Sequence, residues 1–179
     1  MKMVLYYHIL LDENQIWGHI FTEQFKLLED VNLLDKFESV KITISTDDGD
    51  RLAKFIKLAS SYRKVELDVL TNDTDAIEFI SKKMWSDCQE EDFYMLYLHT
   101  KGMSSMNDSL RDGDVQTFKK GRYRHDYLNR IIVVDWKECI INLIRGQDLI
   151  VHFDEKDKSL GDSFWWAKSS YIRMLPQPY

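Results

Sequence analysis

The sequence has little of what marks membrane, secreted or low-complexity proteins. No stretch approaches the roughly 18 to 20 consecutive apolar residues of a membrane-spanning helix. The two cysteines, Cys88 and Cys139, are isolated and have no His or Cys at metal-binding spacing, which argues against a disulfide framework or a zinc site. With seven glycines and two prolines in 179 residues, the chain is neither collagen-like nor disordered in composition.

The beginning of the chain also lacks the marks of a targeting signal. Its apolar segment 4–11 has no basic region before it, no small-residue cleavage site after it, and stops at Asp12 and Glu13. This pattern predicts a buried strand, and we expect a cytoplasmic protein.

What the chain has is enough apolar and aromatic material for one core. Hydrophobic residues make up 44% of it and aromatic residues 13%, which predicts a single domain over residues 1–179. The 24 Lys and Arg against 30 Asp and Glu give a net charge of -6, which argues against a protein that coats a polyanion over its whole surface.

Strand-like and helix-like segments alternate along the first hundred residues. Segments 3–10, 40–45, 65–70 and 93–98 have the pattern of strands, and segments 14–29, 51–60 and 73–87 that of helices. This alternation predicts an α/β fold with a mostly parallel sheet flanked by helices. Ligands bind such sheets at the carboxyl ends of the strands, which selects the segments 7–8, 45–50, 70–73 and 99–102.

The second half of the chain has a less regular pattern. Segment 103–121 is polar without a clear period and predicts a mobile loop, and segment 127–145 predicts a helix broken near Val133. A short apolar run at 149–153 and a helix over 164–174 complete the expected elements.

Two polar segments follow predicted strands. In His99-Thr100-Lys101-Gly102, the Lys and His suit a diphosphate and Gly102 lets the backbone approach it closely. The alternative is a polar turn with a surface lysine. In segment 45–50, Thr46, Asp47 and Asp48 suit a ribose, a base or a divalent cation, and the alternative is a solvated turn in which Asp50 caps a helix.

Two further segments suit an acceptor. At the start of the predicted helix 164–174, Trp165 and Trp166 point about 100° apart, so one ring is expected in the core and the other at a ligand. Asp162, just before this helix, is expected to be either a general base or a helix cap. Segment 119–130 carries a local charge of +4 interleaved with aromatic residues, which suits nucleic-acid phosphates or a diphosphate, although a solvated helix start has the same pattern. Its charged residues are Lys119, Lys120, Arg122, Arg124, Arg130 and Asp126.

Taken together, segments 97–102 (YLHTKG) and 163–176 (SFWWAKSSYIRMLP) resemble a family of small glycosyltransferase-like proteins of bacteria and large viruses. The order of the other segments is similar too, and the resemblance spans nearly the whole chain. It implies a GT-A-like, Rossmann-like fold and a hexosyl- or pentosyltransferase that uses a nucleotide-sugar donor such as a UDP-sugar. For a viral member, the compartment is the cytoplasm of the host.

The chain departs from this family at two places. Enzymes with the GT-A fold commonly hold a divalent cation, Mn²⁺ or Mg²⁺, with an Asp-x-Asp motif after the fourth strand, where this chain has His99-Thr100-Lys101. The metal requirement is therefore open, with Lys101 as a substitute for part of the cation's charge or His99 as a ligand. Relatives commonly have a Ser-Gly-Asn-like triplet where this chain has Gly161-Asp162-Ser163, which either supplies a catalytic carboxylate or changes a cap.

The leading hypothesis is a glycosyltransferase that acts on a hydroxyl acceptor, either a hydroxymethylated base of phage-type DNA or a polysaccharide. The alternative is a non-catalytic module that binds nucleotide sugars or nucleic acid. We expect catalysis from Asp162 and His99. The expected donor-binding residues are Tyr7, His8, Thr46, Asp47, Asp48, His99, Thr100, Lys101 and Gly102, and the expected acceptor-binding residues are Trp165, Trp166, Lys119, Lys120, Arg122 and Arg124.

Overall fold

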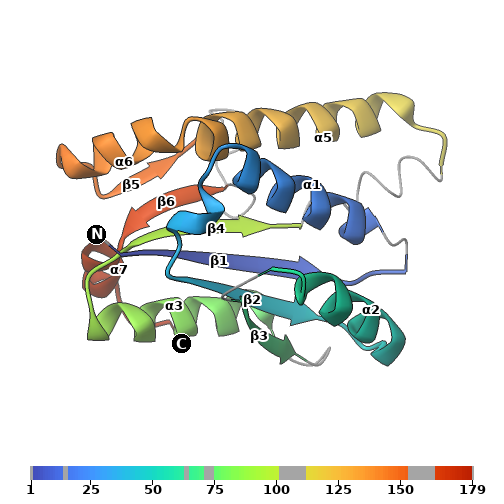
Figure 1. Ribbon diagram of the computed structural model, residues 1–179, viewed down its shortest axis with the longest axis horizontal. Helices are drawn as coiled ribbons and strands as arrows, with labels where there is room; N and C mark the ends of the chain where they lie inside the picture. The colour runs from blue at the N-terminus through green and yellow to red at the C-terminus, as the bar shows by residue number, and fades with distance from the viewer. Residues whose placement is uncertain are drawn as a thin grey trace.

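The strands of the computed structural model form one six-stranded sheet in the order β3-β2-β1-β4-β6-β5 (Figure 1). The structure describes residues 2–13, 16–62, 65–70, 75–100, 112–152 and 164–178. Strands β3, β2, β1 and β4 are parallel, whereas β6 is antiparallel to both β4 and β5. The predicted α/β class with a mostly parallel sheet is confirmed. The strands are β1 (Met3–Leu10), β2 (Ser39–Ser45), β3 (Val65–Leu70), β4 (Tyr94–His99), β5 (Leu149–Val151) and β6 (Trp165–Lys168).

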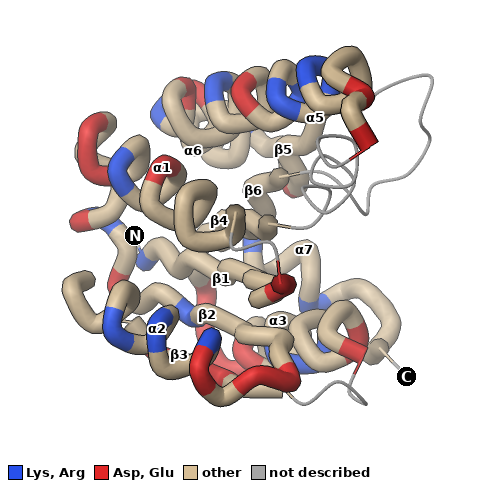
Figure 2. The backbone as a smooth tube through the Cα atoms, turned by 90° about the vertical axis from the view of Figure 1, so that its right-hand side faces the viewer, with Lys and Arg blue, Asp and Glu red and all other residues tan. Residues whose placement is uncertain are grey.

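Helices cover both faces of this sheet. Figure 2 looks along the strands from the end where β1 and β2 finish, with α1 and α2 on one side of the sheet and α3 and α7 on the other. None of the described helices is long and apolar enough to cross a membrane. The helices are α1 (Ile16–Asp30), α2 (Gly49–Ala59), α3 (Ala76–Glu90), α5 (Val115–Leu128), α6 (Trp136–Ile144) and α7 (Ser169–Met174), with a 3-10 helix η1 (Leu34–Lys36) and a π-helix η2 (Asn129–Val134).

Alternation along β1 divides the core between the two faces. Leu5, Tyr7 and Ile9 are buried in the larger cluster, with the aromatic side chains of α1 and α2 and apolar residues of η2 and α6. Val4 and Tyr6 point the other way, into a smaller cluster with residues of α3. A strand that is buried on both faces has a continuous apolar sequence, and this pattern identified β1 in the sequence.

Residues 115–121 form the first turns of α5 instead of the mobile loop predicted over 103–121. The helix begins there because the Asp114 side chain accepts hydrogen bonds from the backbone N–H groups of Gln116 and Thr117, at 3.2 and 3.0 Å. Residues 101–111, the rest of that predicted loop, lie outside the described part of the chain.

The break predicted near Val133 is confirmed, and it takes the form of a π-helix. Helix α5 passes into η2 at Asn129, and α6 follows after Asp135. The wider turn leaves the Ile132 carbonyl to accept a hydrogen bond from the indole N–H of Trp166, at 2.8 Å. The helical run is thereby tied directly to the sheet.

The helix predicted over 164–174 is wrong in its first half, because residues 165–168 form strand β6 and only α7 is helical. β6 pairs with β4 and β5, so its backbone groups are satisfied by distant strands. Adjacent residues of a strand point to opposite faces. Trp166 is therefore fully buried in the larger cluster, stacked on Phe37, while Trp165 is half-buried against Tyr97 on the other face.

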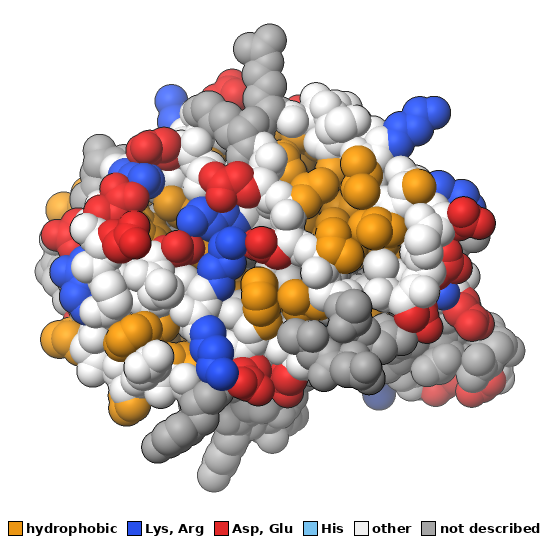
Figure 3. All heavy atoms as spheres, turned by 90° about the horizontal axis from the view of Figure 1, so that it is seen from below, with side chains coloured by type: hydrophobic (Ala, Val, Ile, Leu, Met, Phe, Trp, Pro, Cys, Tyr) orange, Lys and Arg blue, Asp and Glu red, His pale blue; other side chains and the backbone are white. Residues whose placement is uncertain are grey.

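β3 forms one edge of the sheet and exposes apolar side chains. Leu67 is 36% exposed and Val69 48%. The space-filling view from below shows hydrophobic side chains gathered where β3 and α2 meet (Figure 3). Beside them, Glu66 is exposed and Asp68 forms an ion pair with Lys83 of α3 at 2.6 Å.

The two adjacent tryptophans provide a test of the strand register. We expect Trp166→Ala to lower the free energy of unfolding by about 3–5 kcal/mol, since it removes a buried indole and its hydrogen bond. Trp165→Ala, the matched control, should lose about half of that or less. Urea unfolding followed by circular dichroism measures both, and equal losses would contradict the assignment of faces.

Candidate functional site

The order of the strands places a topological switch point between β1 and β4, and the term crevice denotes the position beyond the carboxyl ends of these two strands. From β1 the chain adds β2 and then β3 on one side, and it returns to place β4 on the other side of β1. Helices α1 and α2 lie on one face and α3 on the other, so the connections diverge at this point. Ligands of parallel α/β sheets bind outside the carboxyl ends of the strands at such a switch point.

Buried polar side chains surround this crevice. His8 and His99 face each other in register at the ends of β1 and β4 and are 6% and 2% exposed. Thr100 ties the two strand ends together: its N–H donates to the His8 carbonyl at 3.0 Å, and its hydroxyl accepts from the Leu10 N–H at 3.2 Å. The His8 Nε2 lies 3.1 Å from the Ser45 hydroxyl at the end of β2.

His99 lies among aromatic rings. Its ring centroid is 5.5 Å from that of Tyr97 and 5.4 Å from that of Phe164, which precedes β6 at the same edge. The structure thus brings together the predicted donor residues His8, His99 and Thr100. Lys101 and Gly102, the rest of that motif, lie outside the described residues.

A cavity of about 390 Å³ lies beyond the carboxyl ends of β2 and β3. Leu52, Val69 and Leu70 give it apolar walls, and Thr46, Asp47, Asp48 and Gly49 line it where α2 begins. Apolar walls with a few polar groups at one side are typical of small-molecule sites.

Asp48 has a structural role in this cavity wall. Its carboxylate accepts from the backbone N–H groups of Asp50 and Arg51 and also pairs with the Arg51 guanidinium at 2.9 Å. These interactions hold its pKa below the usual range, with the Arg51 N–H as the largest cause. Asp48 is thus the cap of α2, in place of the expected Asp50. Asp47 pairs with Arg51 at 3.3 Å and keeps 62% of its side chain exposed.

Two expected ligand-binding aromatic residues belong to the core. Tyr7 is 1% exposed, between α1 and the sheet, and its hydroxyl donates to Gln24. Trp166 has no exposed surface. Both side chains therefore lie beneath the site and do not line it. Trp165 keeps a partly exposed ring. One ring is thus in the core and the other partly exposed, because adjacent residues of a strand point to opposite faces.

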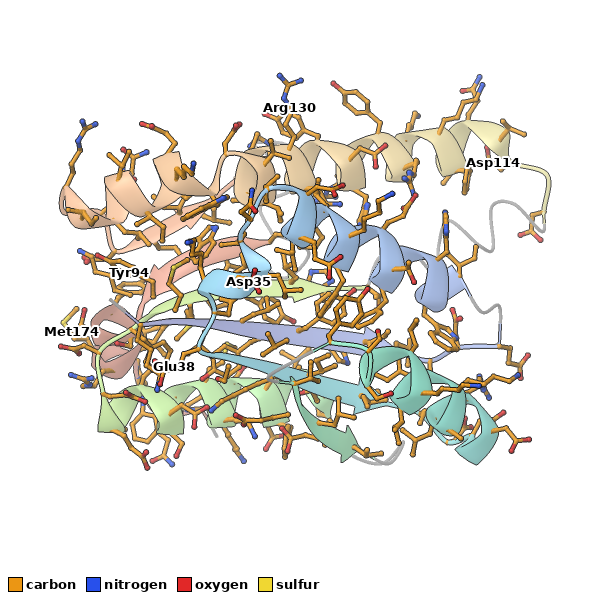
Figure 4. All side chains as sticks on the ribbon, in the orientation of Figure 1. Asp35, Glu38, Tyr94, Asp114, Arg130 and Met174 are labelled. Atoms are coloured by element: carbon orange, nitrogen blue, oxygen red, sulfur yellow. The ribbon has the colours of Figure 1, made fainter. Side chains whose placement is uncertain are left out.

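The basic segment lies along α5, and one of its cations is engaged in the fold. Arg122, one of the predicted acceptor-binding residues, forms two hydrogen bonds with the Glu23 carboxylate of α1, at 2.7 and 3.0 Å. Lys119, Lys120 and Arg130 are exposed, and Arg130 points outward from the helical run (Figure 4). Arg124 is half-buried.

Exposed tyrosines accompany these cations. Tyr123 is 74% exposed and Tyr127 39%, and their rings are nearly parallel with centroids 6.4 Å apart. The Tyr127 ring also contacts His152, which follows β5 at the carboxyl edge. The interleaved basic and aromatic pattern of the sequence is thus a surface of α5.

The described residues do not form a metal site by themselves. Within the ranges that the structure describes, no three His, Cys, Asp or Glu side chains gather closely enough to hold an ion. Asp162, the expected general base, lies outside the described residues.

The sequence did not point to a buried polar cluster of Gln24, His125 and Asn129, which are 1%, 7% and 8% exposed. Gln24 accepts from Tyr7, and Asn129 contacts both Gln24 and His125. One signal was present: Gln24 occupies a position of the apolar face of α1, where an amide needs a buried partner.

Comparison with known proteins supplies no relative for this chain: no family model, no curated protein and no solved structure matches it.

The ion pair between Arg122 and Glu23 should couple α5 to α1. We expect a double-mutant cycle of Arg122→Ala and Glu23→Gln to give a coupling energy of about 1 kcal/mol at pH 7, since the pair is bidentate and partly exposed.

The hydrogen bond from Arg122 lowers the pKa of Glu23 in the folded state. The coupling is therefore fully present above the unfolded pKa and is lost as the pH falls through the folded pKa. Urea unfolding at pH 7 and pH 3 measures it. Lys119→Ala is the control, and a coupling that persists undiminished at pH 3 would contradict the assignment.

Proposed function

We propose that the protein binds a nucleotide-diphosphate sugar over the carboxyl edge of its sheet and transfers the sugar to a hydroxyl acceptor. The observation that carries the proposal is that a cavity beyond β2 and β3 and buried polar side chains at the ends of β1 and β4 share the carboxyl edge of the sheet. The fold class agrees with the resemblance to small glycosyltransferase-like proteins with a GT-A-like fold. Because one fold occurs with many different functions, the support for this activity comes from the side chains at the site.

The cavity suits the nucleoside. A base packs against Leu52 and Val69, and the exposed oxygen of Asp47 accepts a hydrogen bond from a ribose hydroxyl. The Thr46 hydroxyl accepts from the Asp48 N–H at 3.2 Å, so its own proton is available to a ligand oxygen. In this arrangement Asp48 acts only through the cap of α2.

The crevice suits the diphosphate. β2 ends beside it, and the hydroxyl of its terminal Ser45 lies at hydrogen-bond distance from His8. His99 and Thr100 end β4 beside it, and we assign the diphosphate to this place together with Lys101 and Gly102. Positive charge and N–H donors there stabilise the negative charge that develops as the leaving group departs.

The proposed reaction is a displacement at the anomeric carbon of the sugar. A base takes the proton of the acceptor hydroxyl, and we assign this role to Asp162. The hydroxyl oxygen forms a bond to the anomeric carbon while the bond to the phosphate oxygen breaks. The electron pair of that bond leaves with the nucleoside diphosphate, which the donors at the crevice stabilise.

The acceptor is proposed to lie along α5. Exposed Lys119 and Lys120 beside Tyr123 and Tyr127 combine charge with aromatic surface, which suits an anionic polymer. A hydroxymethylated base of phage-type DNA and a surface polysaccharide both provide the hydroxyl.

A non-catalytic binding module is the second candidate. It is favoured by the engagement of the carboxylates near the cavity, since Asp47 and Asp48 both pair with Arg51. The same pocket then binds a nucleotide sugar without turning it over.

A panel of nucleotide sugars, with and without Mn²⁺, tests the donor site by thermal shift. At a concentration 100 times the Kd, the cognate donor adds about 2.7 kcal/mol, which raises Tm by about 5–10 °C. His99→Gln should reduce this shift, whereas His19→Gln, on an exposed residue of α1, should leave it unchanged. No stabilisation by any nucleotide sugar would refute the proposal, and stabilisation without release of nucleoside diphosphate would favour the binding module.

Replacing Lys119 and Lys120 by Ala tests the acceptor surface. For a duplex with hydroxymethylated bases, we expect weaker binding and a slope of log K against log salt that is smaller by ~2, because two phosphate contacts are lost. Lys54→Ala with Lys57→Ala, on the exposed face of α2, is the matched control. Equal effects of both pairs would contradict a role for α5, and no binding by the wild type would exclude DNA as the acceptor.

A further inference from the structure

A chain of buried hydrogen bonds runs from the core of the sheet to His125. The Tyr7 hydroxyl donates to Gln24 Oε1 at 2.5 Å, and Gln24 Nε2 donates to Asn129 Oδ1 at 3.3 Å. Asn129 Nδ2 lies 3.2 Å from His125 Nδ1. The chain joins β1, α1, η2 and α5, and each of its members is at most 8% exposed.

The direction of this chain determines which nitrogen of His125 carries the proton. If Tyr7 donates, each amide accepts with its oxygen and donates with its nitrogen, so His125 Nδ1 accepts and the proton lies on Nε2. The reverse direction would leave the buried Tyr7 O–H without an acceptor among the described residues, which costs about 1–3 kcal/mol. Burial lowers the pKa of His125, which favours the neutral ring. The Asp126 carboxylate lies 3.9 Å from Nδ1, beyond hydrogen-bond distance.

The Nε2 atom of His125 is then a buried donor with no hydrogen-bond partner in the described part of the chain. Native proteins rarely leave such a group unpaired without a reason. The ring stands nearly perpendicular to Phe164, at a centroid distance of 5.7 Å, and a π face is at most a weak acceptor.

The place of His125 relates it to the proposed diphosphate site. Phe164 contacts His125 and also His99, which ends β4 at the crevice. Asn129, which orients His125, begins the π-helix, a local structure that often occurs at functional sites. A neutral imidazole N–H can polarise or bind a substrate oxygen without a charge of its own.

We propose that the Nε2–H of His125 is a hydrogen-bond donor, oriented by Tyr7, Gln24 and Asn129, for a phosphate oxygen of the bound nucleoside diphosphate. This inference rests on the proposed function, because it names a residue of the same donor site. The Phe164 ring, itself buried, lies against the His125 ring, so the proposed contact requires Phe164 to move when the ligand binds.

Long-range ¹H–¹⁵N spectra of the histidine rings test the orientation without any ligand. Wild-type protein should show His125 as the Nε2–H tautomer. Asn129→Asp places a carboxylate at Nδ1 and should move a proton there, whereas Asn142→Asp, the same change on α6, should leave the ring unchanged. An Nδ1–H tautomer in the wild type would overturn the inference and leave the proposed function standing.

Calorimetric titration with UDP, GDP, CDP and ADP tests the ligand contact. We expect the diphosphate that binds wild-type protein to bind His125→Phe about 10-fold more weakly and to shift the Nε2 proton resonance in the wild type. The Phe ring keeps the contact with Phe164 but leaves the Asn129 amide without its acceptor, so His125→Phe should fold with a somewhat lower Tm. This variant also keeps the test open if Asn129→Asp does not fold. Equal affinity of wild type and His125→Phe overturns this inference alone. If none of the diphosphates and no nucleotide sugar binds wild-type protein, the proposed function fails and this inference fails with it.

Discussion

The fold depends on one strand that is bonded on both edges and buried on both faces. β1 pairs in parallel with β2 and β4, and its side chains enter both hydrophobic clusters. A parallel neighbour on each side requires crossover connections that start in opposite directions across the sheet. The crevice at the end of β1 is the result, so its position follows from the requirement to cover both faces.

The electrostatics of this edge differ from those of the whole chain. The protein carries a net charge of -6, but some of its carboxylates are paired with arginines. Arg51 pairs with Asp47 and Asp48, and Arg122 pairs with Glu23. The buried polar side chains at the ends of β1 and β4 are imidazoles and a hydroxyl, which bring no negative charge against an anion.

The sequence predicted those elements whose signal is local. The four parallel strands and their helices have clear periods, and the polar segments after β2 and β4 do lie at one edge of the sheet. Segment 165–168 could not be assigned by this route, because a four-residue strand has too few residues to separate a period of 2 from one of 3.6. Its conformation is fixed by β4 and β5, which are distant in the sequence.

The same reason explains what was missed at the candidate site. The pairing of Arg122 was not predicted, because its partner Glu23 lies 99 residues earlier in the chain. The contact between Gln24 and Asn129 spans 105 residues, and neither amide belongs to a motif. Partners of buried polar groups are determined by tertiary packing, which a single sequence does not report.

The open edge of the sheet at β3 affects how the molecules behave toward one another. An unpaired edge strand with exposed Leu67 and Val69 is a template on which another chain can add a strand and start aggregation. Exposed Glu66 lies beside these residues, so a second copy that pairs edge to edge would bring like charges to the same edge. The charge on β3 thus disfavours strand pairing between copies.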